Sequence, residues 1–220
     1  MIKNLDFSRC CNLGQKLISR FGEMVLNPFF MGELVLVSGK LVACDPLVFP
    51  GTKAFSPKFK PGRYPVILSV AYDKKNDSYM VAYSTLCLSE QIPINWKLAT
   101  RSDEDLNLLP EGKKFGFGVD SGTACFMDAD VAEIIVDTAW EAQIYEETWA
   151  SKLEEGLEKN RYLGCQWINL CVDDHTGGNI IAFESGLGDG FYSSYFGYDT
   201  EGNIVQIVTE FLSGDLPIIL

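Results

Sequence analysis

The sequence predicts a single α+β domain over residues 1–220, whose mainly antiparallel sheet is built from hairpins and has one long amphipathic helix packed on it. Four pairs of apolar, β-branched runs are each separated by a short turn rich in Gly, Asn or Asp, which is typical of hairpins. One stretch, residues 129–159, repeats apolar residues at helical spacing. Because strands and helices do not alternate regularly, a Rossmann or barrel architecture is not expected.

The first element expected is a short N-terminal helix over residues 6–22. Apolar residues recur there at helical spacing, and an Asp or a Ser near the start offers an N-cap. The apolar residues are Leu13, Leu17, Ile18 and Phe21, and the capping residues are Asp6 and Ser8. The helix is expected to end before Asn27-Pro28, because proline disfavours helical backbone in the residue before it.

Four hairpins follow along the chain, each joining two apolar or alternating runs through a turn that suits a tight reversal. Their turns lie at residues 38–40, 74–77, 174–178 and 200–202. Two stretches without a strand pattern separate the hairpins. We expect residues 45–63, which contain four prolines, and residues 101–114 to be loops.

The strongest helical pattern spans residues 129–159, where an apolar stripe recurs every three or four positions. The polar face of this helix is strongly acidic. A solvated surface accounts for such a face, but the face also suits contact with a basic protein. The residues singled out for partner binding are Glu141, Glu146 and Glu147.

Charge and cysteine usage restrict the partners and the compartment. The chain has 18 Lys and Arg against 30 Asp and Glu, a net charge of −12, so its field repels nucleic-acid phosphates and anionic lipids and attracts a basic protein. Neither nucleic acid nor membrane is an expected partner. The seven cysteines form no C-x-x-C pair, and no apolar run has the length of a membrane span or a signal peptide. We therefore expect a cytoplasmic protein.

Few residues offer catalytic chemistry. His175 is the only histidine, and it lies in an Asp-Asp-His-Thr-Gly-Gly turn, where we expect a solvated side chain without the orienting partner that catalysis needs. Cys125 lies in an apolar strand and is interpreted as a buried, unreactive thiol. The sequence therefore predicts no catalytic residue, and it favours a protein that is not an enzyme.

No metal or other cofactor is expected. One histidine and unpaired cysteines do not make a zinc site. Carboxylates that Mg²⁺ or Ca²⁺ could use occur at Asp120, Asp128, Asp130, Asp189 and Asp199. Helix capping and turn formation account for these residues without an ion.

Two glycine-bearing segments form the candidate ligand site. The Asp-Ser-Gly-Thr run at residues 120–123 is similar to the phosphate-binding turn of actin-like kinases, although the other motifs of that fold are absent. The Gly-Leu-Gly-Asp-Gly run at residues 186–190 allows a ligand to approach the backbone closely. Strand breaking and strand packing are the simpler interpretations of both runs. We expect the two segments to lie near each other at one end of the sheet. The residues singled out for ligand binding are Asp120, Ser121, Gly122, Thr123, Gly186, Gly188, Asp189, Gly190 and Tyr192.

Five stretches of the chain resemble a family of bacterial proteins grouped as domain of unknown function 4241. They are LVACDPLV (41–48), PGRYPVILSVA (61–71), FGFGVDSGTACFMDAD (115–130), NIIAFESGLGDGFYSSYFGYDTEGNIV (179–205) and VTEF (208–211). Members of this family look like accessory proteins, some of them encoded near secreted toxins, so the resemblance implies an immunity role. The N-terminal helical segment, residues 1–33, lies outside the resemblance.

These observations predict a non-enzymatic cytoplasmic recognition protein. Its concrete form is an immunity protein that binds and neutralises a bacterial toxin or effector through a basic surface of that partner. The alternative is an enzyme or small-molecule sensor for a phosphate-bearing ligand, with or without Mg²⁺, that uses the segments Asp120–Thr123 and Gly186–Tyr192.

Overall fold

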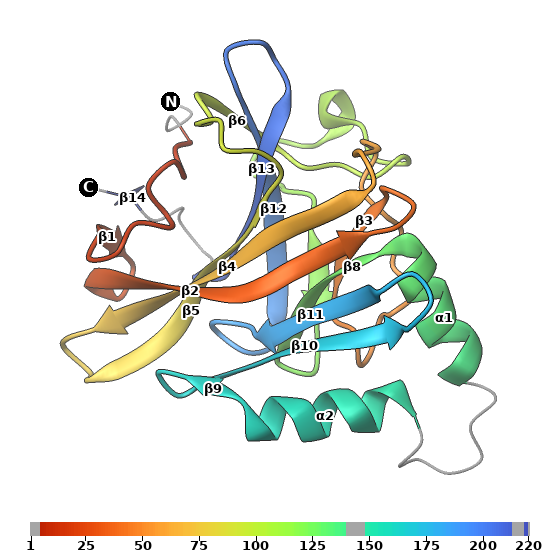
Figure 1. The fold of residues 1–220 in the computed structure, drawn as a ribbon. Helices are drawn as coiled ribbons and strands as arrows, with labels where there is room; N and C mark the ends of the chain where they lie inside the picture. Colours follow the sequence, from red (N-terminus) through yellow and green to blue (C-terminus); the bar gives the residue numbers. More distant parts are fainter. Residues whose placement is uncertain (1–4, 140–147, 213–217, 220) are drawn as a thin grey trace.

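The computed structural model describes residues 5–139, 148–212 and 218–219, which form two antiparallel β-sheets and two α-helices (Figure 1). The larger sheet contains β1 (Lys16–Ser19), β2 (Gly22–Leu36), β4 (Gly62–Asp73), β5 (Ser78–Cys87), β6 (Asn95–Leu98), β7 (Phe117–Val119), β12 (Gly190–Tyr198), β13 (Ile204–Glu210) and β14 (Ile218–Ile219). The smaller sheet contains β3 (Leu41–Cys44), β8 (Thr123–Asp128), β9 (Arg161–Tyr162), β10 (Cys165–Asp173) and β11 (Gly178–Glu184). The helices are α1 (Ala129–Ala139) and α2 (Trp149–Lys159), and a 3₁₀ turn covers Leu106–Leu108.

The predicted α+β class with one long helix is wrong, because strands dominate the described residues and the helical pattern of residues 129–159 gives two short helices. Thr148 is the N-cap of the second helix. Its backbone is extended, with φ −73° and ψ 156°, and its side chain accepts a hydrogen bond from the Ser151 N–H at 3.1 Å. This N-cap starts α2 as a separate helix. Neither described helix is long and apolar enough to cross a membrane.

The predicted N-terminal helix over residues 6–22 is also wrong. Hydrogen-bonded turns lead into β1, which pairs with β2. Leu17 is fully buried and its neighbour Ile18 is 44% exposed, which is the alternation of a strand. A short apolar run fits both the helical spacing and the alternation of a strand. Here the pairing with β2 makes it a strand.

Three of the four predicted hairpins are correct, and the first is wrong. The turns at residues 74–77, 174–178 and 200–202 join β4 to β5, β10 to β11 and β12 to β13. The turn at residues 38–40 instead carries the chain from one sheet to the other, because β2 pairs with β4 whereas β3 pairs with β8.

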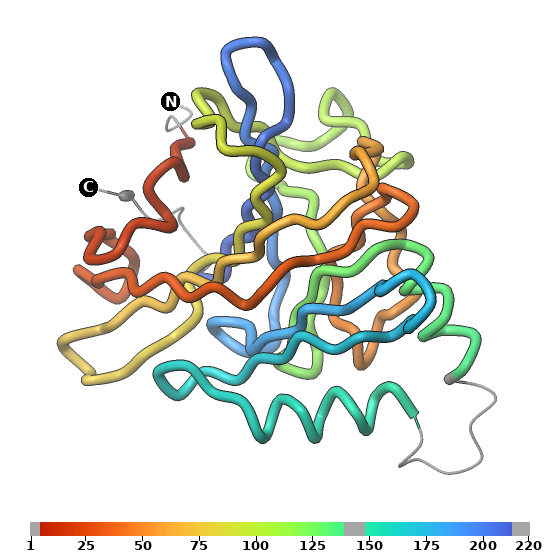
Figure 2. The backbone as a smooth tube through the Cα atoms, in the orientation of Figure 1, coloured from red at the N-terminus to blue at the C-terminus, as the bar shows by residue number. Residues whose placement is uncertain are grey.

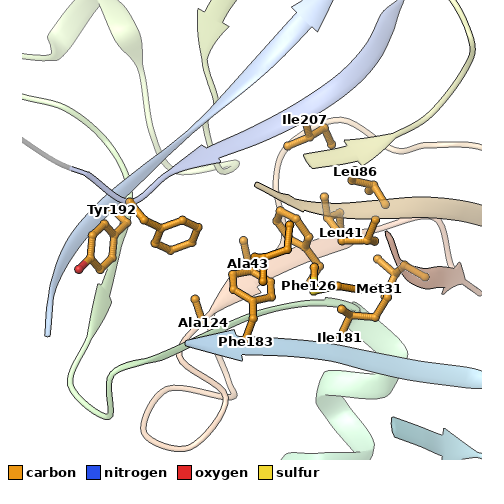
Figure 3. Packing of buried hydrophobic residues seen from close by; sticks show 14 of the residues in the cluster. Met31, Leu41, Ala43, Leu86, Ala124, Phe126, Ile181, Phe183, Tyr192 and Ile207 are labelled. Atoms are coloured by element: carbon orange, nitrogen blue, oxygen red, sulfur yellow. The ribbon is translucent and has the colours of Figure 1, made fainter. Parts of the chain in front are cut away.

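The elements form layers with separate apolar cores. The largest core lies between the two sheets, and Figure 3 shows Leu86 and Ile207 of the larger sheet facing Phe126 and Phe183 of the smaller sheet. A second core lies between the smaller sheet and the two helices. A third lies on the outer face of the larger sheet, where residues 5–11 cover it. Figure 2 accordingly shows the N-terminal segment and the helices on opposite sides of the molecule.

Two buried aspartates fix the ends of the β3–β8 pair. Asp128, the last residue of β8, accepts hydrogen bonds from Ser38 and Gly39, in the turn before β3. Asp45, the residue after β3, accepts hydrogen bonds from the turn before β8. Both carboxylates are fully buried. Each strand therefore ends in an acceptor that holds the turn leading into its partner strand.

Candidate functional site

The structure brings the two predicted glycine segments together, as expected. Asp189, in the segment Gly186–Tyr192, accepts a hydrogen bond from the Gly122 N–H at 3.1 Å. The Ser185 N–H and hydroxyl both donate to the Gly122 carbonyl, at 2.8 and 3.1 Å. The turn Asp120–Thr123 and the segment Gly186–Tyr192 thus form one hydrogen-bonded junction beside β7.

The donors that a phosphate would need in the first segment already have an acceptor. Asp45 accepts hydrogen bonds from the N–H groups of Asp120 and Ser121, at 2.9 and 2.8 Å, and from the Ser121 hydroxyl at 2.8 Å. The Thr123 N–H donates to the Ser121 hydroxyl oxygen at 3.3 Å. The anion-binding turn therefore holds a carboxylate of its own chain. Phosphate binding stays a prediction, and it would require the Asp45 carboxylate to give up its hydrogen bonds to the turn.

The glycines of the second segment have structural roles. A Cβ on Gly186 would lie 2.0 Å from the Val81 carbonyl oxygen, so only glycine fits there. Gly188 has φ +72° and its carbonyl accepts a hydrogen bond from the Tyr192 hydroxyl at 2.7 Å. Tyr192 itself is buried in the core between the sheets, and Gly190 begins β12 beside its ring. Ligand binding by these residues stays a prediction, because close packing accounts for Gly186, Gly190 and Tyr192, and the positive φ accounts for Gly188.

Beside this junction lies an apolar surface, defined by Val48, Phe49 and Phe191. Their exposed fractions are 42%, 45% and 54%. The two rings meet β7 at its glycines: a Cβ on Gly118 would lie 3.8 Å from Phe49, and one on Gly116 would lie 2.9 Å from Phe191. A hollow of about 340 Å³ adjoins Phe49 and is lined by Gly116 and Gly118. Phe49 and Phe191 therefore approach the same short segment, and Val48 precedes Phe49 in the chain, so the three exposed side chains form a patch rather than scattered contacts.

The apolar surface rests on the same buried aspartate. Asp45 accepts hydrogen bonds from the N–H groups of Leu47 and Val48, at 2.9 and 3.1 Å. One carboxylate thus orders both the loop that carries Phe49 and the turn Asp120–Thr123. The sequence analysis missed this surface because it assigned residues 45–63 to a featureless loop. The signal was an apolar Leu-Val-Phe run between two prolines.

The groups considered for catalysis lie apart. His175 is exposed in the turn between β10 and β11, where its backbone N–H donates to the Asp173 carboxylate. Cys125 is buried opposite Cys44, with 3.7 Å between the sulfur atoms. Burial first, and the Cys44 thiol second, raise the pKa of Cys125 well above its ordinary value, so the thiol stays protonated.

Within the described residues, no group of three His, Cys, Asp or Glu side chains is arranged to hold a metal ion. Three of the carboxylates considered for an ion, Asp128, Asp189 and Asp199, have hydrogen-bond partners in the protein. Asp128 binds the turn at Ser38 and Gly39, and Asp199 accepts hydrogen bonds from its own turn at Glu201 and Asn203. The proposed partner site at Glu141, Glu146 and Glu147 lies outside the described residues.

The outer face of the larger sheet holds a buried polar cluster that the sequence analysis also missed. Glu210 is 2% exposed, and burial raises its pKa to about 7, against weaker lowering by the Leu212 N–H, Lys114 and Arg20. Phe7 covers this face. Five buried side-chain atoms in the described part of the chain have no hydrogen-bond partner: Tyr83 Oη, Ser84 Oγ, Trp96 Nε1, Tyr195 Oη and Glu210 Oε1. The only sequence signal was a glutamate between apolar residues in the run VTEF.

Comparison with known proteins identifies the family of the chain. Residues 34–209 match the model of the family described as "Protein of unknown function (DUF4241)", and the chain belongs to this family. This confirms the resemblance seen in the sequence. Neither a curated protein nor a solved structure matches the chain.

Proposed function

We propose that the protein is a non-enzymatic recognition module that binds a basic protein partner, and that its biological role is immunity against a bacterial toxin or effector. The single observation that carries the proposal is the apolar surface of Val48, Phe49 and Phe191 beside β7. Exposed aromatic side chains that lie next to a hollow are typical of the central anchors of protein interfaces.

The support beneath this surface favours binding with little reorganisation. Asp45 holds the loop that carries Phe49, while Phe191 lies on β12, where it pairs with Gly118 of β7. Rings that are already positioned lose less conformational entropy when a partner binds. The surface is therefore ordered before association.

Charge on the Phe191 side of the apolar surface favours a basic partner, whereas the hollow beside Phe49 is lined by the ion pairs Lys53–Asp103 and Arg101–Glu104. Asp120 and Asp189 are exposed on the junction beside Phe191. The net charge of the chain is −12. Acidic groups at the rim accelerate encounter with a cationic protein, whereas the buried apolar contacts set the rate of dissociation. The glycine junction thus serves as the acidic rim of a protein interface.

The proposal is tested with the double variant Phe49→Ala/Phe191→Ala and the matched control Phe30→Ala. Phe30 is 58% exposed on β2, away from β7. The partner tested is the product of the gene next to that of this protein. Binding is measured by surface plasmon resonance, and protection is measured by growth of cells that express both proteins.

We expect the double variant to weaken binding by about a hundredfold or more and to lose protection, because aromatic anchors dominate interface energies. Phe30→Ala should bind and protect like the wild type. Equal loss of binding in the double variant and in Phe30→Ala, or full protection by the double variant, would refute the proposed surface. Failure of the wild-type protein to bind or protect would refute the immunity role.

A further inference from the structure

A second cavity lies on the opposite side of the smaller sheet from the apolar core, between α1 and the loop of residues 51–58. Its volume is about 540 Å³, which is within the range of small-molecule sites. Its apolar wall includes Val42, Phe55, Ala132 and Val136. Neither the family match nor the proposed function assigns any role to it.

Charged residues of both signs surround this wall. Lys40 and Lys58 line the cavity and lie directly opposite each other across an isolated antiparallel bridge. Glu133 and Asp137 line it from α1, four residues apart. Like charges at such positions destabilise the folded chain unless an opposite charge is close.

None of these four side chains forms an ion pair with another residue in the described part of the chain. The third lysine of the cavity, Lys53, differs, because it pairs with Asp103 at 2.6 Å. The cavity therefore presents two cations and two anions, all on exposed residues and without an ion pair in the described part of the chain, around an apolar wall.

The charges are distributed along the cavity. The Lys40 carbonyl accepts a hydrogen bond from the Ala129 N–H at 2.9 Å, so the lysine pair lies at the start of α1. Asp137 lies eight residues further along the helix, a distance of about 12 Å at 1.5 Å per residue. Val136 marks that far end, where a Cβ on Gly51 would lie 3.8 Å from it. Glu133 lies between the two ends.

We propose that this cavity binds a short apolar peptide of about three residues with free termini. Its carboxylate would bind Lys40 and Lys58, its ammonium group would bind Asp137 and Glu133, and its side chains would pack on the apolar wall. An extended chain of three residues spans about 10 Å, which matches the separation of the charged ends. A purely anionic ligand would leave the two carboxylates of α1 without a partner.

The experiment uses the full-length protein and four forms of one peptide, Ala-Leu-Ala: with free termini, N-acetylated, C-amidated, and blocked at both ends. Isothermal titration calorimetry measures the dissociation constants. We expect the free peptide to bind with a dissociation constant of about 1 mM or lower. Each single block should weaken binding about tenfold, because it removes a charge-assisted interaction.

Variants assign each end of the peptide. In Lys40→Ala/Lys58→Ala, the free and C-amidated peptides should bind equally, while N-acetylation still weakens binding. In Glu133→Gln/Asp137→Asn, the free and N-acetylated peptides should bind equally, while C-amidation still weakens binding. The matched control Lys74→Ala/Lys75→Ala, in the turn between β4 and β5, should behave like the wild type. Absence of saturable binding, or equal binding of all four peptides to the wild type, would overturn the proposal, whatever the outcome of the partner-binding test.

Discussion

Two buried carboxylates, in different regions of the molecule, have opposite surroundings. Asp45, which follows β3, accepts five hydrogen bonds, three of them from the turn before β8. Glu210, on the outer face of the larger sheet, is equally buried but has one oxygen without a partner. Burial alone therefore does not determine what an acidic residue contributes; the donors around it do.

The contrast separates a structural role from a pH-sensitive one. The donors around Asp45 compensate its desolvation and order the loop and turn beside the apolar surface. Burial of Glu210, with one carboxylate oxygen lacking a donor, favours its protonated form instead. Three substitutions test this comparison, in order of decreasing effect.

Asp45→Ala should lower the free energy of unfolding by about 4 kcal/mol, because it leaves four partly buried N–H groups and one hydroxyl without their shared acceptor. Denaturation by urea at pH 7 measures the effect. Asp120→Ala is the matched control, since Asp120 is exposed in the same junction and should change stability by about 0.5 kcal/mol or less. A loss below about 1 kcal/mol in Asp45→Ala would show that the carboxylate does not hold the junction.

Glu210→Gln should stabilise the protein at pH 8 and change little at pH 4. The pKa of Glu210 rises from 4.5 to about 7 on folding, so the folded protein binds this proton more tightly than the unfolded chain does. Its stabilising contribution is present below pH 4.5 and is lost as the pH rises through about 7. The loss amounts to about 3 kcal/mol. Urea denaturation across this pH range should show a shallower pH dependence in the variant. A pH dependence equal to that of the wild type would show that Glu210 does not titrate with a raised pKa.

Thr148→Ala tests a partly buried acceptor that caps α2 by accepting a hydrogen bond from the Ser151 N–H. The expected loss is about 1 kcal/mol, the typical value of an N-cap, and Thr148→Ser should retain most of the stability. Circular dichroism during thermal unfolding measures both variants. A loss as large as that of Asp45→Ala would show that the number of donors is not what distinguishes these sites.

Local chemistry in the sequence predicted some of this fold. The turns at residues 74–77, 174–178 and 200–202 contain their own turn-forming residues, and each joins two strands that pair with each other. The pairing of β3 with β8 joins segments about 80 residues apart, and no turn signal encodes it. For the same reason, the turn at residues 38–40 was wrongly predicted as a hairpin.

The candidate site was predictable only in part. Glycine placement led to the correct expectation that Asp120–Thr123 and Gly186–Tyr192 lie together. It could not show that Asp45, 75 residues before Asp120, would occupy the amides of the turn. Phe49 and Phe191 likewise become neighbours of β7 only after the two segments meet. Functions that depend on surfaces assembled from distant segments leave little trace in local patterns.

The central claim, that the apolar surface beside β7 is the interface with a protein partner, is tested most directly by hydrogen–deuterium exchange on the complex with the product of the neighbouring gene. The account predicts that partner binding slows exchange in residues 46–50, 116–122 and 188–192, and leaves α2 and the turn between β10 and β11 unchanged. Protection confined to α2 or to that turn, with unchanged exchange around Phe49 and Phe191, would contradict it.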